Sequence, residues 1–207
     1  GAPIVTLVAW ARVPRWRRPG LALVAGLAVL VAAAWQIRPQ APRPLPSGFR
    51  LTVLDVGQGD AILLEVREGA VLVDQGPPEG DVDDQLRKLG VRDLALAVLT
   101  HPQRDHVGGA AELLRHVRVR RILDPRIPAE NPEHDAALVE ARERHVPVLT
   151  ARAGLAFRLG KLRLRVLWPA GDPPEHEDRN LFATVILASY GSVDVLLTAG
   201  AESPVTL

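Results

Sequence analysis

The chain has 207 residues, no cysteine and a formal net charge of +1. The lack of cysteine excludes disulfides, Cys-ligated zinc, iron–sulfur clusters and thiol nucleophiles. The charge is unevenly distributed. Residues 1–50 contain seven arginines and no acidic residue, so the other 157 residues hold 18 basic and 24 acidic side chains. This distribution argues against a uniformly basic nucleic-acid-binding domain.

A run without charge extends from residue 19 to residue 37 and is rich in Leu, Val and Ala. Because about 20 apolar residues cross the hydrocarbon core of a bilayer, this run predicts a transmembrane helix over 19–37. Trp35 lies at one end, where interfacial aromatic residues are common. Four arginines precede the run and three more widely spaced ones follow it. This asymmetry favours an extracytoplasmic location for the rest of the chain.

A cleaved signal peptide is the alternative, because it too combines a basic start with an apolar centre. Residues 2–11 are mostly apolar and precede the basic cluster, which favours residues 1–18 as the end of a preceding membrane segment and a basic loop. Four prolines within residues 38–48 predict a stiff, extended linker. We therefore expect a folded domain over 49–207.

Strand and helix patterns alternate beyond the linker. Strands are predicted over 49–56, 61–66, 70–74, 94–100, 119–123, 146–150, 156–159, 162–168, 183–189 and 193–198. Helices are predicted over 82–89, 108–116 and 132–145, the last opened by the Asn-Pro-Glu capping pattern at 131–133. The unbroken apolar run 94–100 is typical of a strand buried on both faces. Early hairpins followed by strand–helix alternation predict a layered α/β domain.

Potential metal ligands concentrate in the segment 100–109, which reads Thr-His-Pro-Gln-Arg-Asp-His-Val-Gly-Gly. Two histidines and one aspartate follow the end of a buried strand, and a Gly pair opens the next helix. A loop can bring such imidazole and carboxylate groups together on a divalent metal. A polar loop with two solvated histidines is the alternative, and the residues alone leave both open.

This segment resembles the His-x-His-x-Asp-His motif of the metallo-β-lactamase superfamily. Four further stretches are similar, in order and spacing, to ComEC-type DNA-internalisation competence proteins. They are 54–61 (Leu-Asp-Val-Gly-Gln-Gly-Asp-Ala), 72–76 (Leu-Val-Asp-Gln-Gly), Asn180 with Ala183, and 196–202 (Leu-Leu-Thr-Ala-Gly-Ala-Glu). The resemblance covers residues 50–207. It implies an α/β fold, a metallo-β-lactamase-like layered αββα domain that is truncated at its C-terminal end and preceded by one transmembrane helix.

The resemblance also implies a function. The chain would be part of a DNA-uptake protein of the cell membrane, with its domain outside the cytoplasm hydrolysing phosphodiester bonds of the non-imported DNA strand. The implied partners are single- or double-stranded DNA, the membrane and the remaining transmembrane part of the full-length protein. The implied cofactor is a divalent metal, Zn or Mn, which lowers the pKa of water and stabilises developing charge.

By resemblance, His101, Asp105 and His106 are metal ligands, and Asp105 is also the candidate catalytic carboxylate. Two positions depart from the family pattern. Gln103 stands where His or Asp is usual, and Gly200 stands where an Asp bridges two metals. The final His-rich motif of the family is not within the 207 residues. Because a carboxamide is a poorer ligand than carboxylate or imidazole, we expect weak metal binding, and catalysis stays open.

Other polar residues have supporting roles in this interpretation. Asp74 is expected to support the metal loop from behind, and an ordinary turn is its alternative. The further supporting candidates are Asp55, Gln58, Asp60, Gln103 and Asn180. Five arginines are candidate phosphate contacts, although a solvated basic face is the favoured interpretation: Arg104, Arg115, Arg118, Arg120 and Arg121. Three histidines are predicted to be surface residues: His134, His145 and His176.

Three functions remain open. The first is a DNA-uptake protein whose full-length form hydrolyses DNA. The second is a degenerate domain of the same family that binds or guides DNA without catalysis, as Gly200 and Gln103 suggest. The third is a membrane-anchored metallohydrolase of a small ester or lactone, because one fold hosts many reactions.

Overall fold

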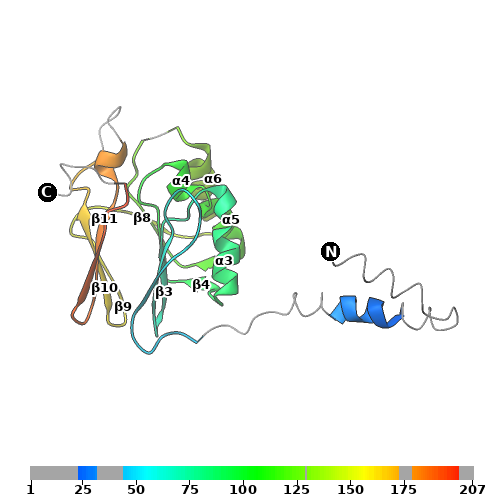
Figure 1. Ribbon diagram of the computed structural model, residues 1–207. Coiled ribbons are helices and arrows are strands. Elements are labelled where there is room, and N and C mark those ends of the chain that lie inside the picture. Colours follow the sequence, from blue (N-terminus) through cyan, green and yellow to red (C-terminus); the bar gives the residue numbers. More distant parts are fainter. Residues whose placement is uncertain (1–22, 32–43, 129, 173–178, 201–207) are drawn as a thin grey trace. The chain divides into compact units, whose positions relative to one another are not determined.

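The computed structural model describes residues 23–31, 44–128, 130–172 and 179–200 (Figure 1). Two compact units divide the chain, Gly1–Ala41 and Pro42–Leu207. The described part of the first unit is a helix over 23–31. Among the residues described, no helix combines the length and hydrophobicity that crossing a bilayer requires. The rest of the predicted transmembrane segment, residues 1–18 and most of the predicted linker lie outside the described residues.

The second unit contains two main sheets and a layer of helices. Its strands are β1 (Arg50–Val53), β2 (Ile62–Val66), β3 (Gly69–Val73), β4 (Asp93–Leu94), β5 (Leu96–Val98), β6 (Arg118–Val119), β7 (Ile122–Asp124), β8 (Val148–Thr150), β9 (Ala156–Leu159), β10 (Leu162–Trp168), β11 (Val185–Tyr190) and β12 (Val193–Leu197). Its helices are η2 (Pro78–Gly80), α3 (Val82–Lys88), α4 (Arg104–Val107), α5 (Ala110–His116), α6 (Pro132–Glu143) and η3 (Arg179–Phe182). The predicted layered α/β domain is confirmed.

The larger sheet has the strand order β1-β2-β3-β5-β7-β8. Its first three strands are antiparallel, and β3, β5, β7 and β8 run parallel. The second sheet is antiparallel, in the order β12-β11-β10-β9. Because parallel neighbours end at the same edge of a sheet, the loops that follow β3, β5 and β7 meet there. That edge carries the candidate site.

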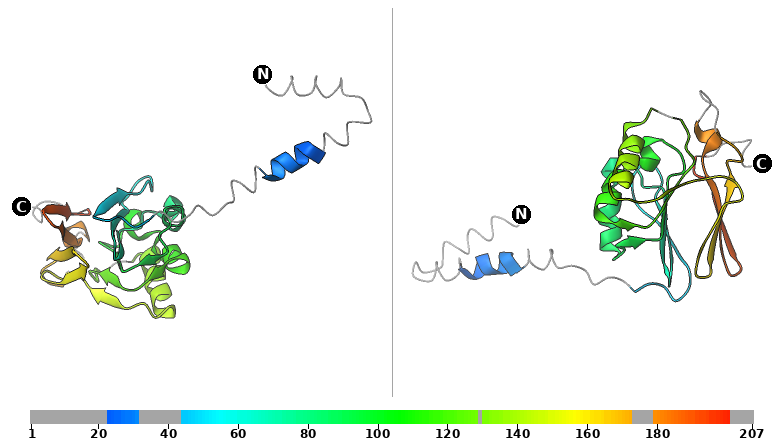
Figure 2. Two further views of the ribbon diagram at one scale, coloured as in Figure 1. Left: turned by 90° about the horizontal axis from the view of Figure 1, so that it is seen from below. Right: turned by 180° about the vertical axis from the view of Figure 1, so that it is seen from behind.

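The layers are helices, larger sheet and second sheet (Figures 1 and 2). One core packs the helices against the larger sheet, with Leu86 and Leu113 facing Leu63 and Leu72. The other core fills the space between the sheets, where residues such as Val98 meet the second sheet. Neighbouring residues of β5 alternate between the two cores, which explains the unbroken apolar run of this segment.

The predicted strand over 94–100 is divided in the structure. Asp93–Leu94 forms β4 and pairs with β6, whereas Leu96–Val98 forms β5 and pairs with β3 and β7. The break lies at Ala95, whose N–H donates to the carbonyl of Ala70. Sequence periodicity missed this break because the apolar run itself is continuous.

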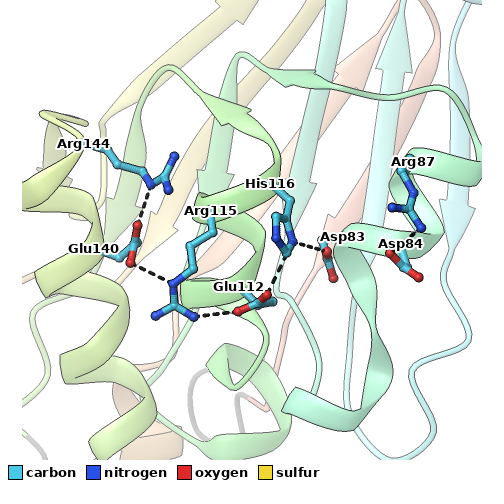
Figure 3. Close-up of polar contacts among 8 residues, drawn as sticks. All are labelled: Asp83, Asp84, Arg87, Glu112, Arg115, His116, Glu140 and Arg144. Atoms are coloured by element: carbon cyan, nitrogen blue, oxygen red, sulfur yellow. Dashed lines mark hydrogen bonds and ion pairs between the residues drawn. The ribbon is translucent and has the colours of Figure 1, made fainter.

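A chain of ion pairs joins α3, α5 and α6 on the outer helical layer (Figure 3). His116 Nδ1 lies 2.6 Å from Asp83 Oδ2, and Glu112 lies beside both His116 and Arg115. Arg115 also reaches Glu140 Oε2 at 3.0 Å.

Arg118 and Arg120 pair with Asp93, and Arg104 pairs with Glu79 and Glu133. These arginines therefore have acidic partners, which weakens the case for a phosphate-binding cluster.

Candidate metal centre

The candidate metal centre lies where β3 and β5 end side by side. Asp74 directly follows β3, and Thr100 and His101 stand two and three residues after Val98, the last residue of β5. We call residues 100–106 the metal loop. Its last residues, Asp105 and His106, lie in α4. Ligands commonly bind outside the carboxyl ends of parallel strands, so this position suits a functional site.

Asp74 is the buried centre of the hydrogen-bond network. Its side chain is 1% exposed, and its backbone has a φ of 58°. Its Oδ1 accepts from the Thr100 N–H at 2.9 Å, and its Oδ2 accepts from the Thr100 hydroxyl at 2.7 Å. Nδ1 of His106 also lies 2.7 Å from Oδ2. The carboxylate therefore holds both ends of the metal loop. These contacts favour the supporting role expected of Asp74, which stays a prediction.

This network sets the tautomers of both histidines. An ionised carboxylate only accepts hydrogen bonds, so the Thr100 hydroxyl gives its single proton to Asp74. Its oxygen then accepts from Nδ1 of His101, 3.0 Å away. His106 donates from Nδ1 to Asp74 in the same way. We infer from this pattern that each neutral ring presents a bare Nε2, the arrangement that second-shell carboxylates impose on metal-binding histidines.

The two histidines differ in electrostatic environment. Burial, with the nearby His106, lowers the pKa of His101, which keeps that ring neutral. Burial also opposes the charged form of His106, but the hydrogen bond and charge of Asp74 outweigh it. With the charges of Asp105 and Asp60, they raise the pKa of His106. A cation at Nε2 of His106 would therefore compete with a proton.

His101 offers a buried ring nitrogen of the kind that a metal ion accepts as a ligand. Its side chain is 1% exposed, and its Nε2 has no hydrogen-bond partner among the described residues. Buried polar atoms in native proteins nearly always have a partner. A Cβ added to Gly200 would lie 3.3 Å from this Nε2 and 3.4 Å from Asn180 Oδ1. The bare nitrogen thus faces the position where the family pattern has a carboxylate.

Asp105 and the histidines supply three donors of the type that Zn²⁺ and Mn²⁺ accept. Asp105 Oδ2 lies 3.8 Å from Nε2 of His106, and the two imidazole rings are 4.1 Å apart at their centroids. Two ligands that each lie about 2.1 Å from one metal are up to about 4.2 Å apart. Asp105 and His106 therefore lie at a separation that one ion can span. The ring of His101 lies beside that of His106, but His101 is not in the set of three described residues whose ligand atoms all lie within 4.8 Å of one another.

Asp60 gives a second acidic group near His106. Asp60, Asp74 and His106 have ligand atoms within 4.8 Å of one another. The contacts of this set run through Nδ1 of His106, which lies 4.0 Å from Asp60 Oδ2 and is hydrogen-bonded to Asp74. The charge of Asp60 acts on His106, and its supporting role toward a metal stays a prediction.

The loop 57–60 is packed directly on the metal loop. The N–H of Asp60 donates to the carbonyl of Asp105, and a Cβ on Gly59 would lie only 1.9 Å from that oxygen. Gly59 also has a φ of 120°, which L-residues rarely adopt. Glycine is thus required at this position for close approach. This gives a physical reason for one glycine of the Gly-Gln-Gly-Asp sequence.

The other supporting candidates lie in two places. Gln103 donates from Nε2 to Asn180 Oδ1 at 2.9 Å, so these two flank the metal loop on the side of Gly200. Asp55 and Gln58 are exposed and line a surface groove with Glu79 and Lys88. No contact described in the structure joins Asp55 or Gln58 to the two histidines.

The sequence interpretation missed several residues around the site. His134 was predicted at the surface but is only 6% exposed, and its Nε2 lies 2.6 Å from Asp124 Oδ2. That prediction was wrong because α6 packs over the end of β7, which no local pattern reveals. Thr100 was also missed, since its relay to Asp74 depends on tertiary contacts. His145 is exposed as predicted, and His176 lies outside the described residues.

The fold and this constellation define a class of protein. The family model described as "Metallo-beta-lactamase superfamily" matches residues 54–195, and the chain belongs to this superfamily. Two solved metallo-β-lactamases share the fold. SMB-1 bound to 2-mercaptoethanesulfonate has a TM-score of 0.53 and 18% identity, over 76% of this chain and 64% of that chain. A B3 enzyme with an active-site glutamic acid has a TM-score of 0.51 and 17% identity, over 80% and 65%.

Two proteins with similar sequences show which members of the superfamily this chain resembles. ComE operon protein 3 of Bacillus subtilis (strain 168) is 26% identical over 178 residues, which cover 76% of this chain and 23% of that protein. The uncharacterized protein YcaI of Escherichia coli (strain K12) is 29% identical over 209 residues, covering 98% of this chain and 24% of that protein. The chain therefore spans less than a quarter of either relative's length. The expected ComEC-type resemblance is confirmed.

Proposed function

We propose that this chain is part of a membrane DNA-uptake protein and that its 49–207 domain hydrolyses phosphodiester bonds with a divalent metal, Zn or Mn. The observation that carries the proposal is the bare, buried Nε2 of His101 beside Asp105 and His106. The similarity to ComE operon protein 3 supports DNA as the partner and the cell membrane as the location. The remaining membrane part and the extracytoplasmic side belong to the same proposal.

Different residues of the chain would have different roles in such a site. His101, Asp105 and His106 would hold the cation, and Asp74 would keep both imidazole rings in the binding tautomer. A bound divalent cation supplies Lewis acidity toward a phosphoryl oxygen and lowers the pKa of water. Asp105 is 34% exposed at its side chain and can also accept a proton from water at the mouth of the site. Gln103 and Asn180 would orient substrate or water through their amide groups.

Gly200 favours a second candidate, a domain that binds DNA without cleaving it. The position faces Nε2 of His101 but offers no side chain, so the described ligand set suits one ion better than two. Two-metal sites normally need bridging carboxylate or equivalent ligands to bring the ions to about 3.5–4 Å. The two candidates share the metal loop and differ in turnover.

The test combines metal binding with substrate assays on the full chain. We expect Mn²⁺ or Zn²⁺ to bind to the wild type and not to the His101→Ala variant, measured by calorimetry. Metal-dependent cleavage of single- or double-stranded DNA that His101→Ala abolishes would support the nuclease. Metal and DNA binding without cleavage would favour the second candidate. Cleavage of esters or lactones but not DNA would contradict both and support a small-molecule hydrolase.

Gly200→Asp tests the geometry of the site directly. The Cβ of a side chain there would lie 3.3 Å from Nε2 of His101, and Gly200 has no positive φ that a side chain would strain. We expect the variant to bind Mn²⁺ at least about 10-fold more tightly, by adding a charged ligand. Gly200→Asn is the matched control, because it has the same shape without the charge. Equal affinities for the two variants would contradict a metal at His101.

A further inference from the structure

One side chain that is neither a proposed metal ligand nor a proposed support of the histidines joins the first turn of α6 to the metal loop. Asn131 is 8% exposed and precedes α6. Its Oδ1 accepts from the N–H of His134 at 2.8 Å, which caps the helix. Its Nδ2 donates to the carbonyl of Pro102 at 3.0 Å. One amide group therefore caps α6 and holds the carbonyl of Pro102, the residue that directly follows His101.

That first turn is itself anchored to the edge of the sheet. His134 Nε2 lies 2.6 Å from Oδ2 of Asp124, the last residue of β7. Asp124 is fully buried, and its Oδ1 accepts from the N–H of Arg126 at 2.5 Å. The strand β7 is hydrogen-bonded to β5. Asp124 at the end of β7 contacts His134, and Asn131, which caps the same helix turn, contacts the loop that follows β5.

The local hydrogen bonds of the metal loop run through its backbone, and no side chain caps the start of α4. Pro102 has no N–H, and Gln103, which precedes α4, makes no side-chain cap because its amide reaches Asn180 instead. A second contact from α6 reaches the same loop, since Glu133 Oε1 lies 3.5 Å from Arg104 Nε. Arg104 is about half exposed, so this ion pair contributes little by itself. The buried Asn131 contact is the specific one.

We propose that Asn131 is a positioning residue for the metal loop, acting through the carbonyl of Pro102 to aim His101 at the metal. This inference rests on the proposed metal site, because the consequence of a misplaced His101 is weaker metal binding. Asp124 and His134 hold the first turn of α6 in place so that Asn131 can reach the loop.

The decisive variant is Asn131→Asp, because Asp keeps the capping acceptor but places a carboxylate oxygen, which cannot donate, against the carbonyl of Pro102. Ala136→Gly is the matched control, since Ala136 is exposed within α6 and its replacement weakens the helix without touching the loop. We expect Asn131→Asp to raise the Mn²⁺ dissociation constant about 10-fold and to change the Co²⁺ absorption spectrum. Ala136→Gly should lower the melting temperature and leave both unchanged.

Hydrogen exchange of the metal-free full chain provides a readout that needs no metal. The amides of Gln103, His106 and Val107 are hydrogen-bonded within the loop and α4. We expect faster exchange of residues 103–107 in Asn131→Asp and wild-type rates in Ala136→Gly. If the wild type binds neither Mn²⁺ nor Co²⁺, the proposed function fails while the exchange rates still decide the role of Asn131. Wild-type exchange in Asn131→Asp, or equal effects in both variants, would overturn the inference.

Discussion

Thr100→Val isolates the hydrogen-bond relay between Asp74 and His101. Valine has nearly the same shape as threonine, so the change removes the hydroxyl without opening a cavity. Two contacts disappear, the 2.7 Å bond to Asp74 Oδ2 and the 3.0 Å bond to His101 Nδ1. The backbone N–H of Thr100 and the ring of His106 still contact Asp74. The carboxylate therefore keeps partners, whereas His101 loses the hydrogen bond at its Nδ1.

The expected decrease in the free energy of unfolding follows from the loss of these two hydrogen bonds. A hydrogen bond to a charged group contributes about 1.5–3 kcal/mol, and a buried donor left without a partner costs about 1–3 kcal/mol. Because contributions in one network are not additive, we expect the free energy of unfolding to fall by about 2–4 kcal/mol. Either ring nitrogen of His101 can then carry the proton, so we also expect metal affinity to fall about 10-fold.

Urea unfolding followed by circular dichroism, and Mn²⁺ calorimetry, would measure the two effects. Thr100→Ser is the matched control, because it keeps the hydroxyl and loses one methyl group, worth about 0.8 kcal/mol. Serine should therefore retain metal affinity near the wild-type value. The reasoning would be refuted if valine and serine variants had equal stability and equal affinity, since the hydroxyl would then contribute nothing to the site.

Two glycines in one loop allow a matched comparison. Gly59→Ala should lower the free energy of unfolding by about 3–5 kcal/mol, because strain at positive φ adds to a clash with the Asp105 carbonyl. Gly57→Ala, which has positive φ but open space, should cost only about 1 kcal/mol, and similar urea midpoints would contradict the packing argument. Hydrogen bonds from Arg144 and Arg115 lower the pKa of Glu140, although burial opposes this shift. The ionised Glu140 side chain therefore stabilises the fold at pH values above its unfolded pKa of about 4.3. The stability difference between wild type and Glu140→Gln should therefore be full at neutral pH and vanish as pH falls through the lowered folded pKa; a pH-independent difference in urea titrations would exclude this ion-pair effect.

Much of the fold could be predicted from local pattern. The Asn-Pro-Glu sequence at 131–133 correctly placed the start of α6, because capping depends on a few adjacent residues. The alternating residues of 162–168 correctly predicted β10, with Leu162 and Leu164 inside and Arg163 outside. Boundaries failed where tertiary pairing decided them. The division of 94–100 into β4 and β5 depends on which neighbouring strand each part meets.

The spacing of His101, Asp105 and His106 indicates imidazole and carboxylate donors whatever their exact geometry, and their role as metal ligands stays a prediction. The superfamily resemblance implies a supporting role for Asp74, and the structure places this residue against the metal loop. The orientation of the rings could not be derived from sequence. It depends on contacts of Asp74 with residues that lie 26 and 32 positions away along the chain.

By itself, then, the sequence determined the elements, the superfamily and the set of candidate ligands, because periodicity, capping and motif spacing are local properties. Only the tertiary structure decided that His101 is buried with a bare Nε2, that Gly200 faces this atom, and that Asn131 donates a hydrogen bond to the metal loop at Pro102. These facts depend on parallel strands that end side by side and bring distant segments together. Hydrogen-bond direction and burial exist only once those segments meet.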